Sequence, residues 1–257
     1  MTRMLASVRN PAEARLVAHS GADIIDLKEP SAGALGALTI PLVADVVASL
    51  RGVKPVSATV GDLPMEPAAL IPAVLTMAST GVDYVKIGFF PGGDWQGVLA
   101  DLEPLAHKGI RLIAVMFADH APEIRWLTQL ARAGFAGAML DTADKQRGSL
   151  CAVATHDFLR TFVMEAARLN LLCGLAGSLR TADIPALLEL RPDYLGFRGA
   201  LCGGVRTDDL DPHCVSELAS VLRAHDDTLI SLTARQPHHV SSSALPEEGW
   251  IRDTIAR

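Results

Sequence analysis

Residues 81–89 read Gly-Val-Asp-Tyr-Val-Lys-Ile-Gly-Phe, a glycine followed by a short apolar run that carries one lysine. They follow a helical candidate at 67–79. A glycine directly after a helix can take the left-handed conformation that ends it, so this stretch predicts a helix end and then a strand. The recurrence of this arrangement predicts one repeated strand–helix unit. Four more glycines stand in the same context: Gly21, Gly52, Gly109 and Gly134.

Strand-like and helical segments alternate along the chain. Asn10, Pro11 and Glu13 predict a capping-box start for the first helix. Eight alternating units are the number found in a (β/α)8 barrel. The short apolar runs fall at 4–8, 22–27, 55–60, 83–87, 110–117, 135–140, 171–174 and 194–197. The helical candidates fall at 11–19, 40–50, 67–79, 95–107, 122–133, 155–168, 182–190 and 212–224.

The length and the loop motifs support one barrel domain. We expect an α/β protein with a single TIM barrel over residues 1–225, for which 257 residues are a usual length. No GxGxxG or Walker-type loop follows a strand, which argues against a doubly wound open sheet. The alternation stops near residue 226. We expect residues 226–257 to be a short C-terminal tail that is either disordered or an oligomer contact.

Composition limits the possible partners. The formal net charge of −6 provides no general attraction for nucleic acid, so an anionic ligand must be held by local groups. The four cysteines lack zinc-site spacing and are expected to be free thiols in a reducing compartment. No apolar run reaches the roughly 18 residues of a membrane span, and the apolar stretch near residue 1 is shorter than a signal peptide is expected to have. We expect a cytoplasmic protein, without nucleic-acid or membrane partners, that forms a homo-oligomer.

Lysine is scarce, since only five of the 23 basic residues are lysine. A lysine can lose its proton and form a Schiff base, whereas arginine cannot. Side chains alternate along a strand, so Asp26 and Lys28 lie on the same face of their strand. Tyr84 and Lys86 likewise lie on the same face of theirs. The apolar residues between them are expected to meet the outer helices. Both lysines are therefore predicted to point into the barrel mouth.

The remaining lysines fall into two groups. Lys145 lies in the loop after Asp141, which closes the sixth strand. Lys54 and Lys108 precede strands and belong to the opposite end of the barrel. Because barrel enzymes build their active sites at the carboxyl ends of the strands, we expect Lys145 to join the active site.

Such a cluster points to amine chemistry. Crowding with other ammonium groups and partial burial lower the pKa of a lysine from about 10.4. The neutral amine can then form an imine with a carbonyl, which is an electron sink for carbon–carbon chemistry. Asp26 and Asp141 can keep a neighbouring lysine charged or shuttle protons. The alternative is that each lysine only pairs with its nearby aspartate at the barrel rim.

The loops after the seventh and eighth strands predict an anion site. Barrels often hold phosphate there, and glycines let backbone amides converge on it. A phosphorylated substrate is therefore expected, although glycine-rich turns also occur for purely steric reasons. The sequence contains no metal-binding motif, and we expect neither a metal nor a cofactor. The candidate phosphate-binding residues are Gly174, Ala176, Gly177, Ser178, Arg198, Gly199 and Ala200.

Two further features have weaker signals. Asp119 ends the fifth strand, where it could act or could only cap the following helix. Residues 31–36 form a loop beside Lys28 that is either a lid or a plain long connection.

Several of these motifs together resemble the (5-formylfuran-3-yl)methyl phosphate synthase family. The similarity extends over about residues 4–222, and the tail lies outside it. The motifs are DLKEP at 26–30, GALGA at 33–37, DYVKIG at 83–88, DTADK at 141–145, GLAGS at 174–178 and GFRGA at 196–200.

The resemblance implies a metal-free, class I aldolase-like Schiff-base barrel. Such an enzyme condenses two molecules of glyceraldehyde 3-phosphate, with loss of water and phosphate, to give the furan precursor of methanofuran. It implies that Lys28 forms the imine and that Lys86 accepts a proton. Asp26, Asp141 and Lys145 would be the supporting acid–base groups.

Three other functions remain open from the residues alone. A class I aldolase of phosphorylated sugars would share the imine lysine and the phosphate loops. An isomerase or epimerase of sugar phosphates would need no covalent lysine. A non-catalytic barrel that binds a phosphorylated metabolite would use the lysines as anion ligands only.

Overall fold

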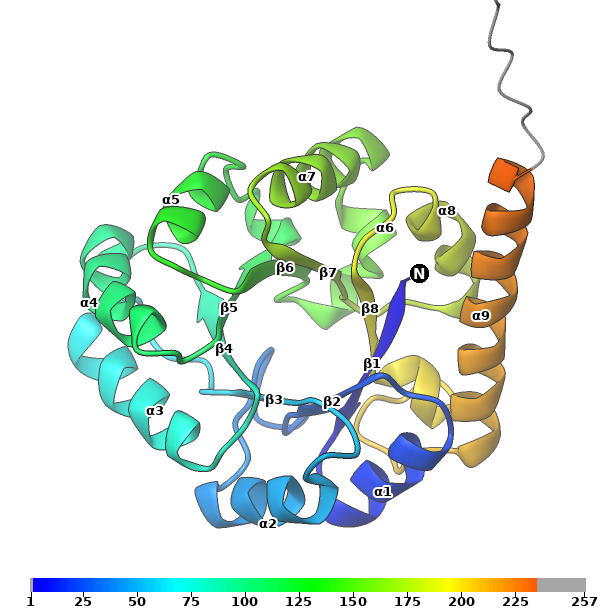
Figure 1. Cartoon of the computed structure of the whole chain (residues 1–257), viewed down its shortest axis with the longest axis horizontal. Coiled ribbons are helices and arrows are strands. Elements are labelled where there is room, and N and C mark those ends of the chain that lie inside the picture. Colours follow the sequence, from blue (N-terminus) through cyan, green and yellow to red (C-terminus); the bar gives the residue numbers. More distant parts are fainter. Residues whose placement is uncertain (1, 235–257) are drawn as a thin grey trace, which may run out of the picture.

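A computed structural model describes residues 2–234, and the part of the expected tail at 235–257 lies outside the described residues. The strands form one closed parallel barrel in sequence order, with helices around it, so the predicted TIM barrel is confirmed (Figure 1). The strands are β1 Arg3–Val8, β2 Ile24–Leu27, β3 Val56–Thr59, β4 Tyr84–Phe89, β5 Leu112–Phe117, β6 Gly137–Asp141, β7 Leu172–Leu175 and β8 Tyr194–Phe197.

The helices follow the predicted alternation, and the first four have the predicted bounds. The last one continues ten residues beyond its predicted end at 224, to Ala234. The α-helices are α1 Pro11–His19, α2 Ile40–Leu50, α3 Pro67–Ser79, α4 Trp95–His107, α5 Trp126–Arg132, α6 Leu150–Val153, α7 His156–Arg168, α8 Ile184–Leu188 and α9 Pro212–Ala234. Short 3-10 helices, which were not predicted, are η1 Ala118–His120, η2 Lys145–Arg147, η3 Thr181–Asp183 and η4 Gly199–Cys202.

The five glycines that punctuate the pattern all adopt left-handed conformations. Their φ angles are 105° at Gly21, 76° at Gly52, 85° at Gly81, 97° at Gly109 and 75° at Gly134. Such angles are strained for residues with a β-carbon. Each glycine therefore ends a helix and turns the chain back toward the barrel, as predicted.

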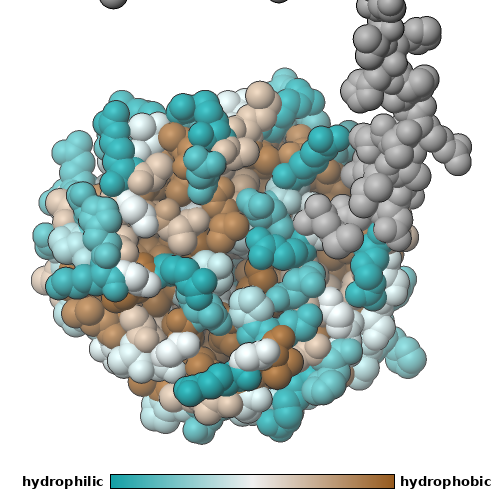
Figure 2. Space-filling model, in the orientation of Figure 1, coloured by the Kyte–Doolittle hydropathy of each residue, from teal (hydrophilic) through white to brown (hydrophobic). Residues whose placement is uncertain are grey.

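Apolar side chains pack on both sides of the barrel wall, in one layer outside the strands and one inside. The outer layer, between strands and helices, contains Ile25 and Leu27, while the inner one contains Val115 and Phe117. The apolar neighbours of Lys28 thus face the helices, as predicted. Hydrophilic residues are spread over the rim of the molecule, with hydrophobic residues exposed between them (Figure 2). Within residues 2–234, no helix is long and apolar enough to cross a membrane.

Candidate active site

The strand register builds the first half of the site around Asp26. Ser7 on β1, Asp26 on β2 and Ser57 on β3 are paired side by side. Each serine hydroxyl donates a hydrogen bond to the Asp26 carboxylate, at 2.9 Å and 2.6 Å respectively. The ammonium of Lys86 on β4 donates to the same carboxylate at 2.9 Å. Strands β1, β3 and β4 therefore each place one donor on this buried carboxylate.

The Asp26–Lys86 pair is enclosed in the barrel. Asp26 is 1% exposed and Lys86 is 2% exposed. Burial by itself would raise the pKa of Asp26, but the charge of Lys86, the Ser57 hydroxyl and the charge of Lys28 lower it below its ordinary value. Asp26 is thus held as a carboxylate that can orient the ammonium of Lys86 and exchange a proton with it.

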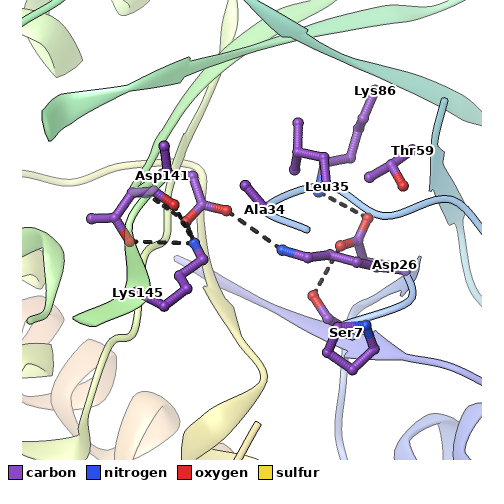
Figure 3. Close-up of polar contacts among 12 residues, drawn as sticks. Ser7, Asp26, Ala34, Leu35, Thr59, Lys86, Asp141 and Lys145 are labelled. Carbon is purple, nitrogen blue, oxygen red and sulfur yellow. Dashed lines mark hydrogen bonds and ion pairs between the residues drawn. The ribbon is translucent and has the colours of Figure 1, made fainter. Parts of the chain in front are cut away.

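Asp141, at the end of β6, organises the second half of the site. One of its oxygens accepts a hydrogen bond from Lys145 at 2.5 Å, and the other lies 3.7 Å from the ammonium of Lys28. Lys145 also donates to the carbonyl oxygen of Thr142. Figure 3 shows Asp141 and Lys145 as one group and Asp26, Ser7 and Lys86 as another. Two lysines therefore share one carboxylate, and Lys145 holds it more closely.

This unequal sharing leaves Lys28 as an easily deprotonated amine. Burial is the main cause that lowers the pKa of Lys28 from 10.5 to about 8. The charge of Asp141 opposes this fall, and the like charges of Lys145 and Lys86 add to it. The pKa of Asp141 falls from 3.8 to about 2, since Lys145, Lys28 and the Thr142 amide overcome the effect of burial. At a pKa of about 8, roughly one Lys28 in ten is neutral at pH 7, against about one in 2500 for an ordinary lysine.

These groups face a cavity of about 480 Å³ at the barrel mouth. Lys54 and Lys108 lie away from it, in the turns before β3 and β5, as the sequence predicts. Every predicted site residue except Gly174 lines the cavity: Asp26, Lys28, Lys86, Asp141, Lys145, Ala176, Gly177, Ser178, Arg198, Gly199 and Ala200.

The loops after β7 and β8 present backbone amides at this cavity. Gly177 has a φ of 113°, and a β-carbon there would lie 2.9 Å from the Thr142 amide nitrogen, so the turn requires glycine. Ser178 is also left-handed, with a φ of 47°. Among the described residues, the amides of Gly177 and Ser178 have no protein acceptor. They are therefore able to donate to an anion.

Arg198 lines the cavity, but its guanidinium is already committed to the protein. It bonds both carboxylate oxygens of Glu13, at 2.5 Å and 3.2 Å. Its other donors reach the carbonyl oxygens of Ser7, Arg206 and Asp208. These contacts use all five N–H groups of an arginine. The expected phosphate contact of Arg198 is thus restricted to its backbone, and its side chain ties the β8 loop to α1.

Gly174 has a structural place within β7. A β-carbon at this position would lie 2.2 Å from the ring of Tyr194, which crosses it inside the barrel. The glycine therefore makes room for the tyrosine, and it lies outside the cavity in which phosphate binding is expected.

Asp119 has a role that its sequence position did not reveal. Its carboxylate accepts the backbone amides of Ala143 at 2.9 Å and Asp144 at 2.8 Å. It does not cap the next helix, because α5 begins only at Trp126. Asp119 instead positions the loop that leads into Lys145.

The loop at 31–36 partly fills the barrel mouth. Leu35 is fully buried in the inner apolar layer, and its amide and that of Ala34 donate to Asp62 at 2.7 Å each. The hydroxyl of Thr59 donates to the carbonyl oxygen of Gly36 at 3.0 Å. These contacts hold the loop against the inner apolar layer, close to Asp26 and Lys86 (Figure 3).

The site consists of amines and carboxylates that line one cavity. Within residues 2–234, no three His, Cys, Asp or Glu side chains are grouped so as to hold a metal ion. Sequence reasoning missed Ser7, Ser57 and Arg206, which line the same cavity or contact its carboxylates. Serines and arginines are common, and only the register and the loop path bring these three to the site.

Comparisons with known proteins show the family of this chain. The family model described as 4-HFC-P synthase matches residues 4–219, a range that includes every candidate residue. The chain belongs to the (5-formylfuran-3-yl)methyl phosphate synthase family. The family predicted from the sequence motifs is thus confirmed.

Members of the (5-formylfuran-3-yl)methyl phosphate synthase family align with most of this chain. A homologue from Methylorubrum extorquens is 42% identical over 86% of this chain and 92% of its own length. The synthase of Methanocaldococcus jannaschii is 35% identical over 86% of this chain and 99% of its own. The solved phosphoribosyl anthranilate isomerase of Thermotoga maritima covers 87% of this chain and 100% of its own, with a TM-score of 0.65 and 14% identity. That last similarity concerns the fold alone.

Proposed function

We propose that this protein condenses two molecules of glyceraldehyde 3-phosphate into (5-formylfuran-3-yl)methyl phosphate through a Schiff base on Lys28. The product would be a precursor of methanofuran, and the enzyme a lyase that releases phosphate. One observation carries the proposal. Lys28, whose pKa is about 8, lines the same cavity as the loops after β7 and β8.

The first step joins the Lys28 nitrogen to the aldehyde carbon of one triose. The carbinolamine that forms must lose its hydroxyl group as water, which requires a proton donor. The ammonium of Lys86, paired with Asp26 at 2.9 Å, supplies that proton. The carbon–nitrogen double bond is then complete, and Lys86 is left neutral beside Asp26.

Neutral Lys86 is then the base for the second step. It takes a proton from the carbon next to the imine, and the electron pair moves into the imine to form an enamine. The enamine carbon attacks the aldehyde of the second triose and forms the new carbon–carbon bond. Ring closure, eliminations and hydrolysis of the imine then release Lys28. In total, two trioses yield one furan phosphate, one inorganic phosphate and two waters.

The second half of the site keeps Lys28 reactive between steps. Lys145 neutralises Asp141 at 2.5 Å, so this carboxylate attracts the proton of Lys28 less strongly. The charge of Lys145 itself also lowers the pKa of Lys28. Gly177 and Ser178 line the same cavity, and their amides would bind a substrate phosphate there.

Borohydride reduction in the presence of glyceraldehyde 3-phosphate, followed by mass mapping, tests the covalent step. We expect an adduct on Lys28, and a complete absence of lysine adducts would exclude the mechanism. The overall reaction is tested separately by released phosphate and a new furan absorbance. A class I aldolase would give the adduct without either product signal.

A further inference from the structure

Arg206 is a cavity residue that belongs to neither phosphate loop motif. It follows η4 on the chain and lines the same cavity as Lys28 and Asp141. Its Nη2 donates to the carbonyl oxygens of Pro30 at 2.6 Å and Gly33 at 2.8 Å. The guanidinium thus connects the segment after β8 to the loop that follows Lys28.

Three other cavity cations have a close carboxylate partner, whereas Arg206 has none among the described residues, and Arg180, which also has none there, is exposed. Lys86 pairs with Asp26, Arg198 with Glu13, and Lys145 with Asp141. Among the described residues, Arg206 has no carboxylate within ion-pair distance, although it is half-buried. Burial is the main cause that lowers its pKa below the ordinary value. A partly buried cation without a counter-ion is costly unless a ligand supplies the negative charge.

The donors of Arg206 also remain available. Two of its five N–H groups are used by Pro30 and Gly33, and the part of the chain that the structure describes offers no acceptor to the other three. The side chain starts beside the β8 loop, since a methyl group placed on Gly199 would lie 4.0 Å from the β-carbon of Arg206. Arginine presents paired donors that match the oxygens of a phosphate.

We propose that Arg206 is the side chain that binds a substrate phosphate, and that it links this phosphate to the 31–36 loop beside Lys28. Asp62 holds the same loop from the other side through the amides of Ala34 and Leu35. A phosphate on Arg206 would therefore join the anion site, the loop and the imine lysine into one unit. The identity of the phosphate as part of a triose rests on the proposed function, whereas anion binding by Arg206 does not.

Calorimetric titration of the full chain with inorganic phosphate tests anion binding without any turnover. We expect Arg206→Gln to weaken phosphate binding by about 10-fold or more, because a charged hydrogen-bond donor is lost. Arg168→Gln is the matched control, because Arg168 is an exposed arginine at the end of α7, outside the cavity. We expect the Arg168→Gln variant to bind phosphate within about twofold of wild type. Equal weakening in both variants, unchanged binding in Arg206→Gln, or no binding by wild type would overturn the proposal.

Substrate selectivity gives a second measurement. Borohydride trapping of glyceraldehyde 3-phosphate should weaken at least about 10-fold in Arg206→Gln, with trapping of unphosphorylated glyceraldehyde nearly unchanged. Equal losses for both aldehydes would show a purely structural role. Arg206→Lys keeps a cation and should bind phosphate more tightly than Arg206→Gln, which keeps the test valid if the neutral variant folds poorly. Failure of wild type to make a furan would refute the proposed function, and the phosphate titration would still stand.

Discussion

The ammonium nitrogen of Lys28 lies 3.7 Å from a carboxylate oxygen of Asp141, an ion pair without a hydrogen bond. The other oxygen of Asp141 is bonded to Lys145 at 2.5 Å. Asp141 therefore orders Lys28 without holding its proton firmly. This arrangement solves the central problem of a Schiff-base lysine, which must be fixed in position yet partly neutral.

The rate of imine trapping should rise with pH, with a midpoint near 8, because the neutral form of Lys28 is the nucleophile. Lys145→Met removes a like charge and frees Asp141, and both changes favour the ammonium form of Lys28. The midpoint should move to higher pH, with trapping at pH 7 slower by about 10-fold. Lys108→Met is the control, because Lys108 lies at the opposite end of the barrel. An unchanged midpoint in Lys145→Met would contradict this account.

Replacing the two central lysines by arginine should separate their roles. Lys28→Arg cannot form an imine, so both the adduct and the furan should be lost. Lys86→Arg keeps the charge beside Asp26 but cannot release its proton. This variant should still trap substrate on Lys28 while furan formation falls by roughly 100-fold or more. Mass mapping measures the adduct, and furan absorbance measures turnover. Near-normal turnover in both variants would show that the two lysines only bind anions.

Asp119→Ala should lower kcat without unfolding the protein. The substitution removes the two hydrogen bonds that position the loop before Lys145. We expect kcat to fall by about 10-fold, and the midpoint of the trapping profile to move upward as in Lys145→Met but less far. Measuring both quantities distinguishes positioning from a general loss of folded protein, which would lower the amplitude and leave the midpoint near 8.

Glu13→Ala should destabilise the barrel by about 3–5 kcal/mol, because it leaves the buried guanidinium of Arg198 without its partner. The side chains of Glu13 and Arg198 are only 6% and 8% exposed. The surface pair of Arg160 and Asp157 provides the comparison, with side chains that are 51% and 88% exposed. Asp157→Ala should leave the denaturant midpoint unchanged. Similar effects from both substitutions would show that burial of the Arg198 pair has no special weight.

The ionisation of Asp141 should make the free energy of unfolding depend on pH in the acidic range. Its pKa falls from 3.8 to about 2 in the folded protein, so the carboxylate stabilises the fold above pH 3.8. The contribution is about 2 kcal/mol and is lost as the pH falls through about 2. Between pH 4 and pH 2, the free energy of unfolding should therefore fall by about that much more in wild type than in Asp141→Asn. Equal slopes for the two proteins would show that Asp141 is not held as an anion.

Local sequence signals predicted most of the architecture. Glycines such as Gly81 mark helix ends because few other residues tolerate a φ of 85°. Side chains alternate along a strand, which predicted that Lys28 and its apolar neighbours Ile25 and Leu27 face opposite sides of the barrel wall. The short helices α6 and η1 to η4 were not predicted, since so few residues carry no clear periodicity. The extension of α9 to Ala234 was missed because the polar residues at 225–228 interrupt the apolar pattern used to detect it.

The capping residue Glu13 shows where such reasoning ends. Its place in Asn10-Pro11-Ala12-Glu13 predicts a helix start, and the Glu13 amide does bond the Asn10 side chain at 2.9 Å. Its carboxylate, however, contacts the Arg9 amide and the guanidinium of Arg198, which is 185 positions away. No local pattern contains that information, and the expectation that the Arg198 side chain contacts phosphate arose from this gap.

The sequence alone determined the number of strand–helix units, the faces of Lys28 and Lys86, and the family. These properties follow from short-range periodicity and contiguous motifs. Only the tertiary structure decided which charges pair. Sequence proximity suggested Asp26 for Lys28, yet Asp26 bonds Lys86 and Lys28 lies beside Asp141. Inward-facing side chains of a closed barrel converge inside it, so Asp26 on β2 reaches Lys86 on β4, two strands away, and Lys28 reaches Asp141 on β6. Such partners lie far apart in the sequence, and no local pattern relates them.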